Sequence, residues 1–209
     1  MNLFKGDNIV RKVLIIMTEL MYVNFLALIF CLPVVTAGAS LTAMHNVLLK
    51  VVRREVEFVR RSFWESFKAN FRQATLIWLI VLGIAVLFYV DLRLINVMGT
   101  AFPMLMKLIL IGVIIFVFMM LQYVFPLLSH FENTIGGTLR NAFLLVFAEF
   151  PRTFAMTLCS LSPLLVIYIL GYRSVPTILL FGLAGPGALC ALFYSKVFKK
   201  LEPKEEQEA

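Results

Sequence analysis

Few side chains in this sequence could do chemistry, and they are scattered. Neither His45 nor His130 has a cysteine or a second histidine at the spacing of a zinc site. The three cysteines form no CxxC pair. Ser160 and Ser162 lie in an apolar run without a base, and no P-loop, HExxH or GxSxG motif occurs. We therefore expect no enzyme, no catalytic residue, no metal site and no cofactor.

The first apolar run carries the polar groups that a membrane function would use. Between Lys12 and Lys50 the only charged residue is Glu19. An ionisable group inside hydrocarbon is costly and is a functional candidate by default. The structural alternative, which we favour, is that a basic partner or protonation neutralises Glu19. The candidate intramembrane polar residues are Glu19, Asn24, Thr36 and His45.

The composition excludes an ordinary water-soluble domain. Of 209 residues, 61% are hydrophobic and 15% are charged, and the mean hydropathy is +0.94. These values are typical of a polytopic membrane protein. The net charge is +7, but the basic residues gather between the apolar runs. We therefore attribute the excess to one basic membrane face, with the lipid bilayer as partner, and predict no nucleic-acid partner.

Four runs without a charged residue can each cross a bilayer once, since a crossing helix needs about 20 apolar residues. They contain 18, 24, 20 and 22 residues and cover 73–90, 108–131, 153–172 and 174–195. An earlier run, 13–49, is too long for one crossing and is interrupted by Pro33 and Gly38. Such residues end or restart helices, so we predict a tight hairpin. This run also exceeds the ~7–15 apolar residues of a signal peptide, and we expect it to be retained.

Six crossings place both termini in the cytoplasm and 16 of the 19 Lys and Arg residues inside, as the positive-inside rule favours. A five-helix alternative, in which the second segment lies on the surface, places 13 inside. A half-embedded helix over 39–52 is also left open.

We thus predict an all-α protein with one membrane domain, 1–209, built as three hairpins in the cell membrane. The expected spans are about 13–33, 39–52, 74–92, 104–128, 153–172 and 176–196. Amphipathic helices are expected in two cytoplasmic segments, followed by a charged tail; these are 53–73, 129–152 and 199–209.

Both expected cytoplasmic segments carry aromatic residues at helical spacing. Phe63, Phe67 and Phe71 recur at steps of four and form one stripe on a helix. Such helices commonly lie in the headgroup layer, held by aromatic and basic side chains. The alternative is a helix that docks a partner. The candidate docking residues are Phe63, Trp64, Phe67, Phe71, Phe143 and Phe147.

Three stretches carry a resemblance to a known family: Leu32–Ser40, Phe63–Arg72 and Tyr123–Thr134. In order and spacing they resemble the YesL-like family of bacterial membrane proteins of unknown function, and the resemblance covers nearly the whole chain. It implies a small integral membrane protein, typical of Gram-positive bacteria and often encoded beside carbohydrate ABC importers and polysaccharide-degrading enzymes. No catalytic residue carries over, because none is established for the family.

Two functions fit these expectations. The first is a non-catalytic accessory or regulatory subunit of a carbohydrate ABC importer, with permease subunits as partners. The chain has neither a P-loop nor the EAA-like loop of importer permeases, so we do not expect it to be the ATPase or the permease itself. The second is an independent small-solute transporter or channel, suggested by six spans and a polar first hairpin.

Overall fold

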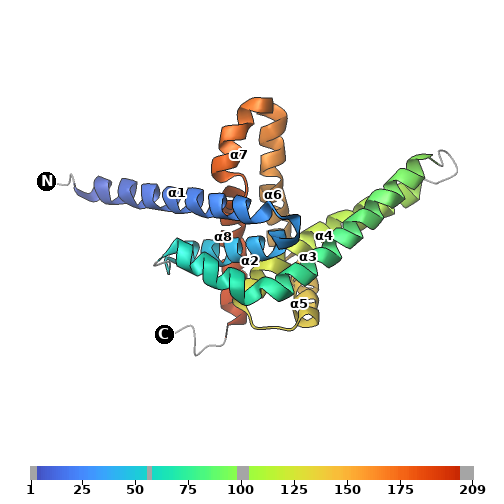
Figure 1. The fold of residues 1–209 in the computed structure, drawn as a ribbon, viewed down its shortest axis with the longest axis horizontal. Helices are drawn as coiled ribbons and strands as arrows, with labels where there is room; N and C mark the ends of the chain where they lie inside the picture. The colour runs from blue at the N-terminus through green and yellow to red at the C-terminus, as the bar shows by residue number, and fades with distance from the viewer. Residues whose placement is uncertain (1–3, 56–57, 98–103, 203–209) are drawn as a thin grey trace.

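Most of the described chain is helical. The computed structural model describes residues 4–55, 58–97 and 104–202 (Figure 1). Its helices are α1 (Phe4–Cys31), α2 (Ala37–Arg53), α3 (Val59–Val97), α4 (Met104–His130), α5 (Ile135–Ala148), α6 (Phe150–Leu170), α7 (Val175–Phe181) and α8 (Ala184–Leu201), with short 3-10 turns η1 (Val34–Thr36) and η3 (Gly171–Ser174). No strand occurs in these residues, so the expected all-α class is confirmed. Residues 203–209 of the expected tail lie outside them.

The chain is a multi-pass membrane protein. Five helical stretches among the described residues are long and apolar enough to cross a bilayer: Val10–Cys31, Val34–Arg53, Val59–Ile95, Met104–His130 and Phe150–Phe181. The expected sixth span, 176–196, is divided between α7 and α8. The exact number of crossings therefore stays a prediction, and so do their boundaries.

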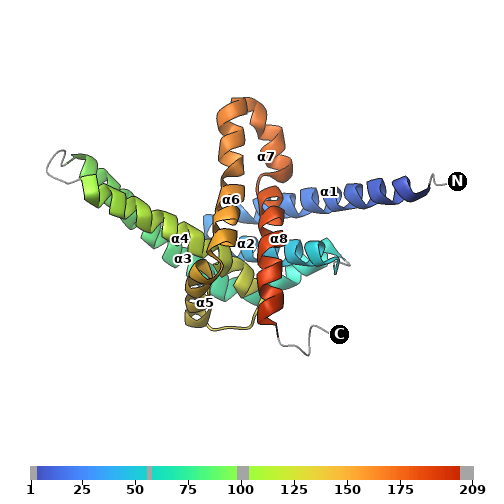
Figure 2. The same ribbon diagram turned by 180° about the vertical axis from the view of Figure 1, so that it is seen from behind.

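Helix α2 lies at the centre of the molecule (Figures 1 and 2), packed against α1, α3, α4 and α8. Its first residues, Ala37–Ser40, are all buried. Small side chains allow backbones to approach closely, and a Cβ on Gly38 would lie only 2.5 Å from the Ala74 carbonyl oxygen. The Ser40 hydroxyl donates to the Ala27 carbonyl at 2.9 Å. Protein, rather than lipid, thus encloses much of α2.

Three arms project from this centre (Figures 1 and 2). One is the hairpin of α6 and α7, one is formed by the distal halves of α3 and α4, and one is the N-terminal half of α1. The outer side chains of the α3–α4 and α6–α7 arms are mostly large and apolar; Leu87, Ile109 and Leu164 are each more than half exposed. A helix that is apolar all round needs a cover of lipid or protein. We therefore assign these surfaces to the bilayer.

Helix α3 joins two predicted elements into one. It runs without interruption over 39 residues, about 58 Å at 1.5 Å per residue. The expected cytoplasmic helix within 53–73 and the expected span 74–92 are therefore consecutive halves of the same helix. Because this length exceeds the ~30 Å hydrocarbon core, only part of α3 can lie in hydrocarbon.

The first hairpin packs against the amphipathic half of α3 and the beginning of its apolar half. Gly38 packs against Ala74, and Trp78 Nε1 donates to the Val34 carbonyl at 2.7 Å. The turn between α1 and α2 is therefore level with the beginning of the expected third span and not with its far end. Hydropathy alone does not reveal this register, because it counts apolar residues without showing which neighbours they meet. The full crossing of 39–52 and its half-embedded alternative both stay predictions.

Asn24 holds together the break between α7 and α8. Its side-chain amide donates to the Leu179 carbonyl at 2.7 Å and accepts from the backbone N–H groups of Leu183 and Ala184 at 2.8 and 2.9 Å. Asn24 itself is fully buried. Apolar surroundings offer no other partner to a broken backbone, so this one side chain allows the expected sixth span to be interrupted.

Candidate functional site

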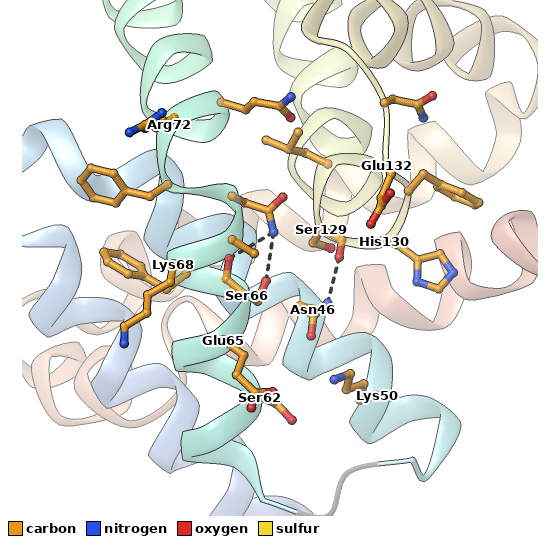
Figure 3. A pocket seen from close by; sticks show the side chains of 18 of the residues that line it. Asn46, Lys50, Ser62, Glu65, Ser66, Lys68, Arg72, Ser129, His130 and Glu132 are labelled. Atoms are coloured by element: carbon orange, nitrogen blue, oxygen red, sulfur yellow. Dashed lines mark hydrogen bonds between the residues drawn. The ribbon is translucent and has the colours of Figure 1, made fainter.

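An open groove of about 1180 Å³ lies between α2, the first half of α3, and the end of α4 with the loop 131–134 (Figure 3). We call it the polar groove. Most of its lining side chains are polar or charged, and they include Asn46, Lys50, Glu65, Ser129, His130 and Glu132. The groove therefore offers charge and hydrogen-bonding groups where the rest of the molecule is mostly apolar.

Hydrogen bonds between elements hold the walls of the polar groove in place. Asn46 Nδ2 donates to the Ser129 carbonyl at 2.9 Å and so joins α2 to the end of α4 (Figure 3). At the start of α5, the Thr134 hydroxyl accepts from the Gly137 backbone N–H at 3.2 Å. Such a side chain caps a helix N-terminus. The loop 131–134 is thus anchored where α5 begins.

Charges of both signs surround the opening. Lys50, Glu65 and Glu132 come from α2, α3 and the loop after α4 (Figure 3). Lys68 of α3 also lines the groove, and its ammonium lies 5.0 Å from the centre of the Trp64 ring. A mixed-charge rim of this kind can orient a charged peptide segment.

Beside the groove, Arg53 and His130 both bind the carboxylate of Glu202. Arg53 Nη2 and His130 Nε2 lie 2.6 and 2.7 Å from the same oxygen, and the His130 ring stacks on Phe198. Burial opposes ionisation of Glu202, but the hydrogen bonds from Arg53 and His130 outweigh it and lower its pKa below the ordinary value. These contacts tie the end of α8 to α2 and α4.

A second ion-pair cluster ties α8 to the start of α6. Lys200 Nζ lies 2.9 Å from one carboxylate oxygen of Glu149, and Arg152 pairs with the other. The hydrogen bond from Lys200, together with the Arg152 charge, lowers the pKa of Glu149 despite some burial. Both clusters lie at the end of the molecule that carries the polar groove.

The structure corrects the docking prediction for Phe63 and Phe67. They are 1% and 7% exposed, and the Phe30 ring lies 5.8 and 5.1 Å from theirs. Aromatic area that α1 already covers is not available to a partner. Their neighbours Trp64 and Phe71 stay partly exposed. Helical spacing thus identified one aromatic face, but not that this face turns inward.

Phe143 and Phe147 lie on a different surface. Both rings pack against Phe116 of α4 with centroids 5.6 Å apart, and both remain exposed on their outer sides. The structure therefore separates these two residues from the Phe63 stripe. A docking role for them stays a prediction.

Glu19 and Asn24 differ in their surroundings although both belong to α1. Glu19 lines a small hollow of about 210 Å³ with Lys12 and Arg54, and forms no ion pair among the described residues. Asn24, by contrast, is committed to the backbone of the α7–α8 break. Neutralisation of Glu19, by a basic partner or by protonation, stays a prediction.

Thr36 and His45 are each engaged locally. The Thr36 hydroxyl donates to the Phe30 carbonyl at 2.7 Å, and His45 Nδ1 lies 3.3 Å from the Tyr194 hydroxyl. Within the described chain, no hydrogen bond links any two of the four predicted intramembrane polar residues. The structure does not join them into one polar path.

The sequence did not point to the polar groove or to the Glu202 cluster. The groove combines side chains from three segments, and nothing in the order of residues links Arg53 to Glu202. The one available signal was the position of charged residues at expected helix ends. In the described part of the chain, no group of three or more His, Cys, Asp or Glu residues could hold a metal ion.

Comparison with known proteins identifies the relatives of this chain. A family model described as a protein of unknown function, DUF624, matches residues 20–92. The uncharacterized protein YesL of Bacillus subtilis (strain 168) is 27% identical over 198 residues, which cover 91% of this chain and 90% of YesL. The resemblance to the YesL-like family is confirmed. No solved structure matches. The segment matched by DUF624 includes α2 and the first half of α3, and hence two walls of the polar groove.

Proposed function

We propose that this chain is a non-catalytic protein of the cell membrane that acts as an accessory or regulatory subunit of a carbohydrate ABC importer. The observation that carries the proposal is the polar groove, an open hollow with Lys50, Glu65 and Glu132 on its rim. Charges of both signs on a fixed rim suit a peptide segment of a partner, since complementary charges set orientation and partner choice. The family resemblance supplies the kind of partner, a permease subunit.

The proposal assigns no catalytic step to the groove. His130, its lining histidine, already binds Glu202, and the Ser129 hydroxyl donates to the Pro126 carbonyl at 2.8 Å. A nucleophile needs a base within hydrogen-bond reach, and these groups are engaged elsewhere. The arrangement supports binding better than turnover.

In this proposal the groove and both termini face the cytoplasm. Lys12 and Arg54 line one hollow, so the N-terminal part of α1 lies at the same end as the turn after α2. The ion pair of Arg53 with Glu202 brings the end of α8 to that end as well. Basic residues concentrated near membrane helix ends favour the cytoplasmic face.

Copurification from a mild detergent tests the proposal. Tagged wild-type protein is expected to recover importer permease subunits, and Lys50→Glu or Glu132→Lys is expected to lower the recovery several-fold by reversing a rim charge. Arg140→Glu is the matched control, because Arg140 is exposed on α5 and does not line the groove. Failure to recover any permease subunit with wild-type protein would contradict the accessory role, and unchanged recovery with both rim variants would contradict the groove.

One observation favours the alternative, an independent small-solute transporter or channel. Transporters often bind substrate where a membrane helix is broken, and the described chain has such a break between α7 and α8. Asn24, however, is fully buried and already forms hydrogen bonds with the backbone groups of this break. Uptake of a solute by the purified protein alone in liposomes would support the transporter.

A further inference from the structure

A second hollow, of about 790 Å³, lies between α1 and the beginning of α3. We call it the aromatic hollow. Its floor and walls are mostly aromatic, with Phe30 and Phe63 on the inside and Phe58 and Trp64 more exposed. Phe30 packs against Phe63 and Phe67, and the hollow lies at the partly exposed edge of this aromatic stripe.

Two arginines, Arg60 and Arg61, line the same hollow. Arg61 Nε donates to the Glu65 carboxylate at 2.8 Å. Arg60 is exposed and makes no hydrogen bond or ion pair among the described residues. An arginine in this position has its guanidinium available to an anion, and the fork of donors fits the oxygens of a phosphate.

The hollow continues onto an apolar face of α1. Tyr22 and Leu26 form its α1 side, and the neighbouring Phe25 and Ile29 are 59% and 45% exposed. These residues belong to a helical stretch apolar enough to cross a membrane. The arginines of the hollow therefore lie next to an exposed apolar face of α1. A phospholipid has the same order of groups, with a charged headgroup followed by an apolar acyl chain.

We propose that the aromatic hollow binds an anionic phospholipid of the inner leaflet. Its phosphate lies at Arg60, and an acyl chain follows Tyr22 and Leu26 along α1. Aromatic side chains such as Trp64 favour the headgroup level of a bilayer, and basic residues there attract anionic lipid. A soluble protein partner would leave the exposed face of α1 uncovered, whereas a lipid covers both the hollow and that face.

Tryptophan fluorescence provides a direct test, because the chain has two tryptophans and Trp64 lines the hollow. In a Trp78→Phe background, Trp64 is the only source of tryptophan fluorescence. The full chain is reconstituted into phosphatidylcholine vesicles containing a small fraction of brominated phosphatidylglycerol, or the same fraction of brominated phosphatidylcholine. Bromine quenches tryptophan on contact. We expect stronger quenching by the anionic lipid.

Arg60→Gln is expected to lower that preference about fivefold, the factor that one basic residue near an anionic surface contributes. Arg140→Gln removes the same charge from α5, outside the hollow, and is expected to keep the preference. Size-exclusion profiles check that both variants fold. Added inorganic phosphate is expected to leave Trp64 emission in pure phosphatidylcholine vesicles unchanged.

Four outcomes would overturn the proposal. Equal quenching by the two brominated lipids in the Trp78→Phe protein would mean that the hollow does not select anionic lipid. An unchanged preference in Arg60→Gln, or an equal loss in Arg140→Gln, would mean that the protein's overall charge and not the hollow attracts the lipid. A response to inorganic phosphate would assign Arg60 to a free anion. None of these measurements requires an importer subunit, so they test the lipid site separately from the accessory role.

Discussion

The Asn24 side chain accepts a hydrogen bond from the backbone N–H of Ala184 at 2.9 Å, although 160 residues separate the two. The same amide donates to the Leu179 carbonyl, so one side chain serves both ends of the break between α7 and α8. An amide can do this because it carries a donor and an acceptor together. Asn24 therefore joins the first helix to the last hairpin.

Asn24→Ala is expected to destabilise the protein strongly. It leaves backbone groups of Leu179, Leu183 and Ala184 without their partner, and each unsatisfied buried group costs about 1–3 kcal/mol. The expected loss is therefore about 3 kcal/mol or more, visible as a lower midpoint of thermal unfolding in detergent. Asn141→Ala on the exposed face of α5 is the matched control and should change little. A wild-type midpoint for Asn24→Ala would show that the break does not depend on this residue.

The burial of Phe63 and Phe67 predicts a loss of stability and not a selective loss of binding. Truncating a buried phenylalanine to alanine costs about 3–5 kcal/mol, so each single variant should unfold at lower temperature in detergent. Trp64→Ala, at a 42% exposed side chain, should have a smaller effect. If Phe63→Ala and Phe67→Ala kept wild-type stability but lost a bound partner, the docking prediction for the stripe would be restored.

The sequence predicted the elements of the fold better than their relative placement. Charge-free runs located most of the apolar helices, because each must be long enough for hydrocarbon, but the run 174–195 is divided between α7 and α8. Pro33 with Gly38 correctly predicted a break between α1 and α2. The register of α2 on α3 depends instead on a backbone contact between Gly38 and Ala74. Hydropathy contains no information on such a contact.

The sites were harder to predict for a similar reason. Asn24 was identified as an intramembrane polar residue, but its partners are backbone atoms of residues 179–184, which no side-chain pattern reveals. Glu202 lies in a charged stretch that resembles a solvated tail, yet Arg53 and His130 bind it. Such a cluster forms only after α2, α4 and α8 have packed together, so neither its members nor the polar groove has a local signature.

Acid is expected to weaken the attachment of α8. Burial opposes the charge on Glu202, but the hydrogen bonds from Arg53 and His130 outweigh it, so its pKa is lower in the folded protein. Such a carboxylate stabilises the fold above its unfolded-state pKa of about 4.3, and the contribution disappears as pH falls through the lower folded-state value. The thermal midpoint in detergent should therefore fall below about pH 4. The thermal midpoint of Glu202→Gln should be lower than that of the wild type at pH 5 and should fall less between pH 5 and pH 3. An identical acid loss in Glu202→Gln would assign the effect to other groups.

Cysteine labelling tests the orientation of the chain. In a background without Cys31, Cys159 and Cys190, we expect Val10→Cys and Lys199→Cys to react with an impermeant maleimide only after the cells are permeabilised. Arg173→Cys, in the turn between α6 and α7, should react in intact cells. Reaction of Val10→Cys from outside would place the N-terminus outside and contradict the arrangement in which both termini are cytoplasmic.

The position of Val35 decides whether α2 crosses the membrane. Val35 is 51% exposed and belongs to the turn between α1 and α2, where a full crossing would carry it to the outer surface. The hydrogen bond from Trp78 to Val34 instead keeps this turn level with the first residues of the apolar half of α3. We therefore expect Val35→Cys not to react with the impermeant reagent in intact cells. Arg173→Cys, labelled in parallel as the control, should react. Rapid external labelling of Val35→Cys would show that the first hairpin crosses the bilayer in full, as the charge distribution alone predicts.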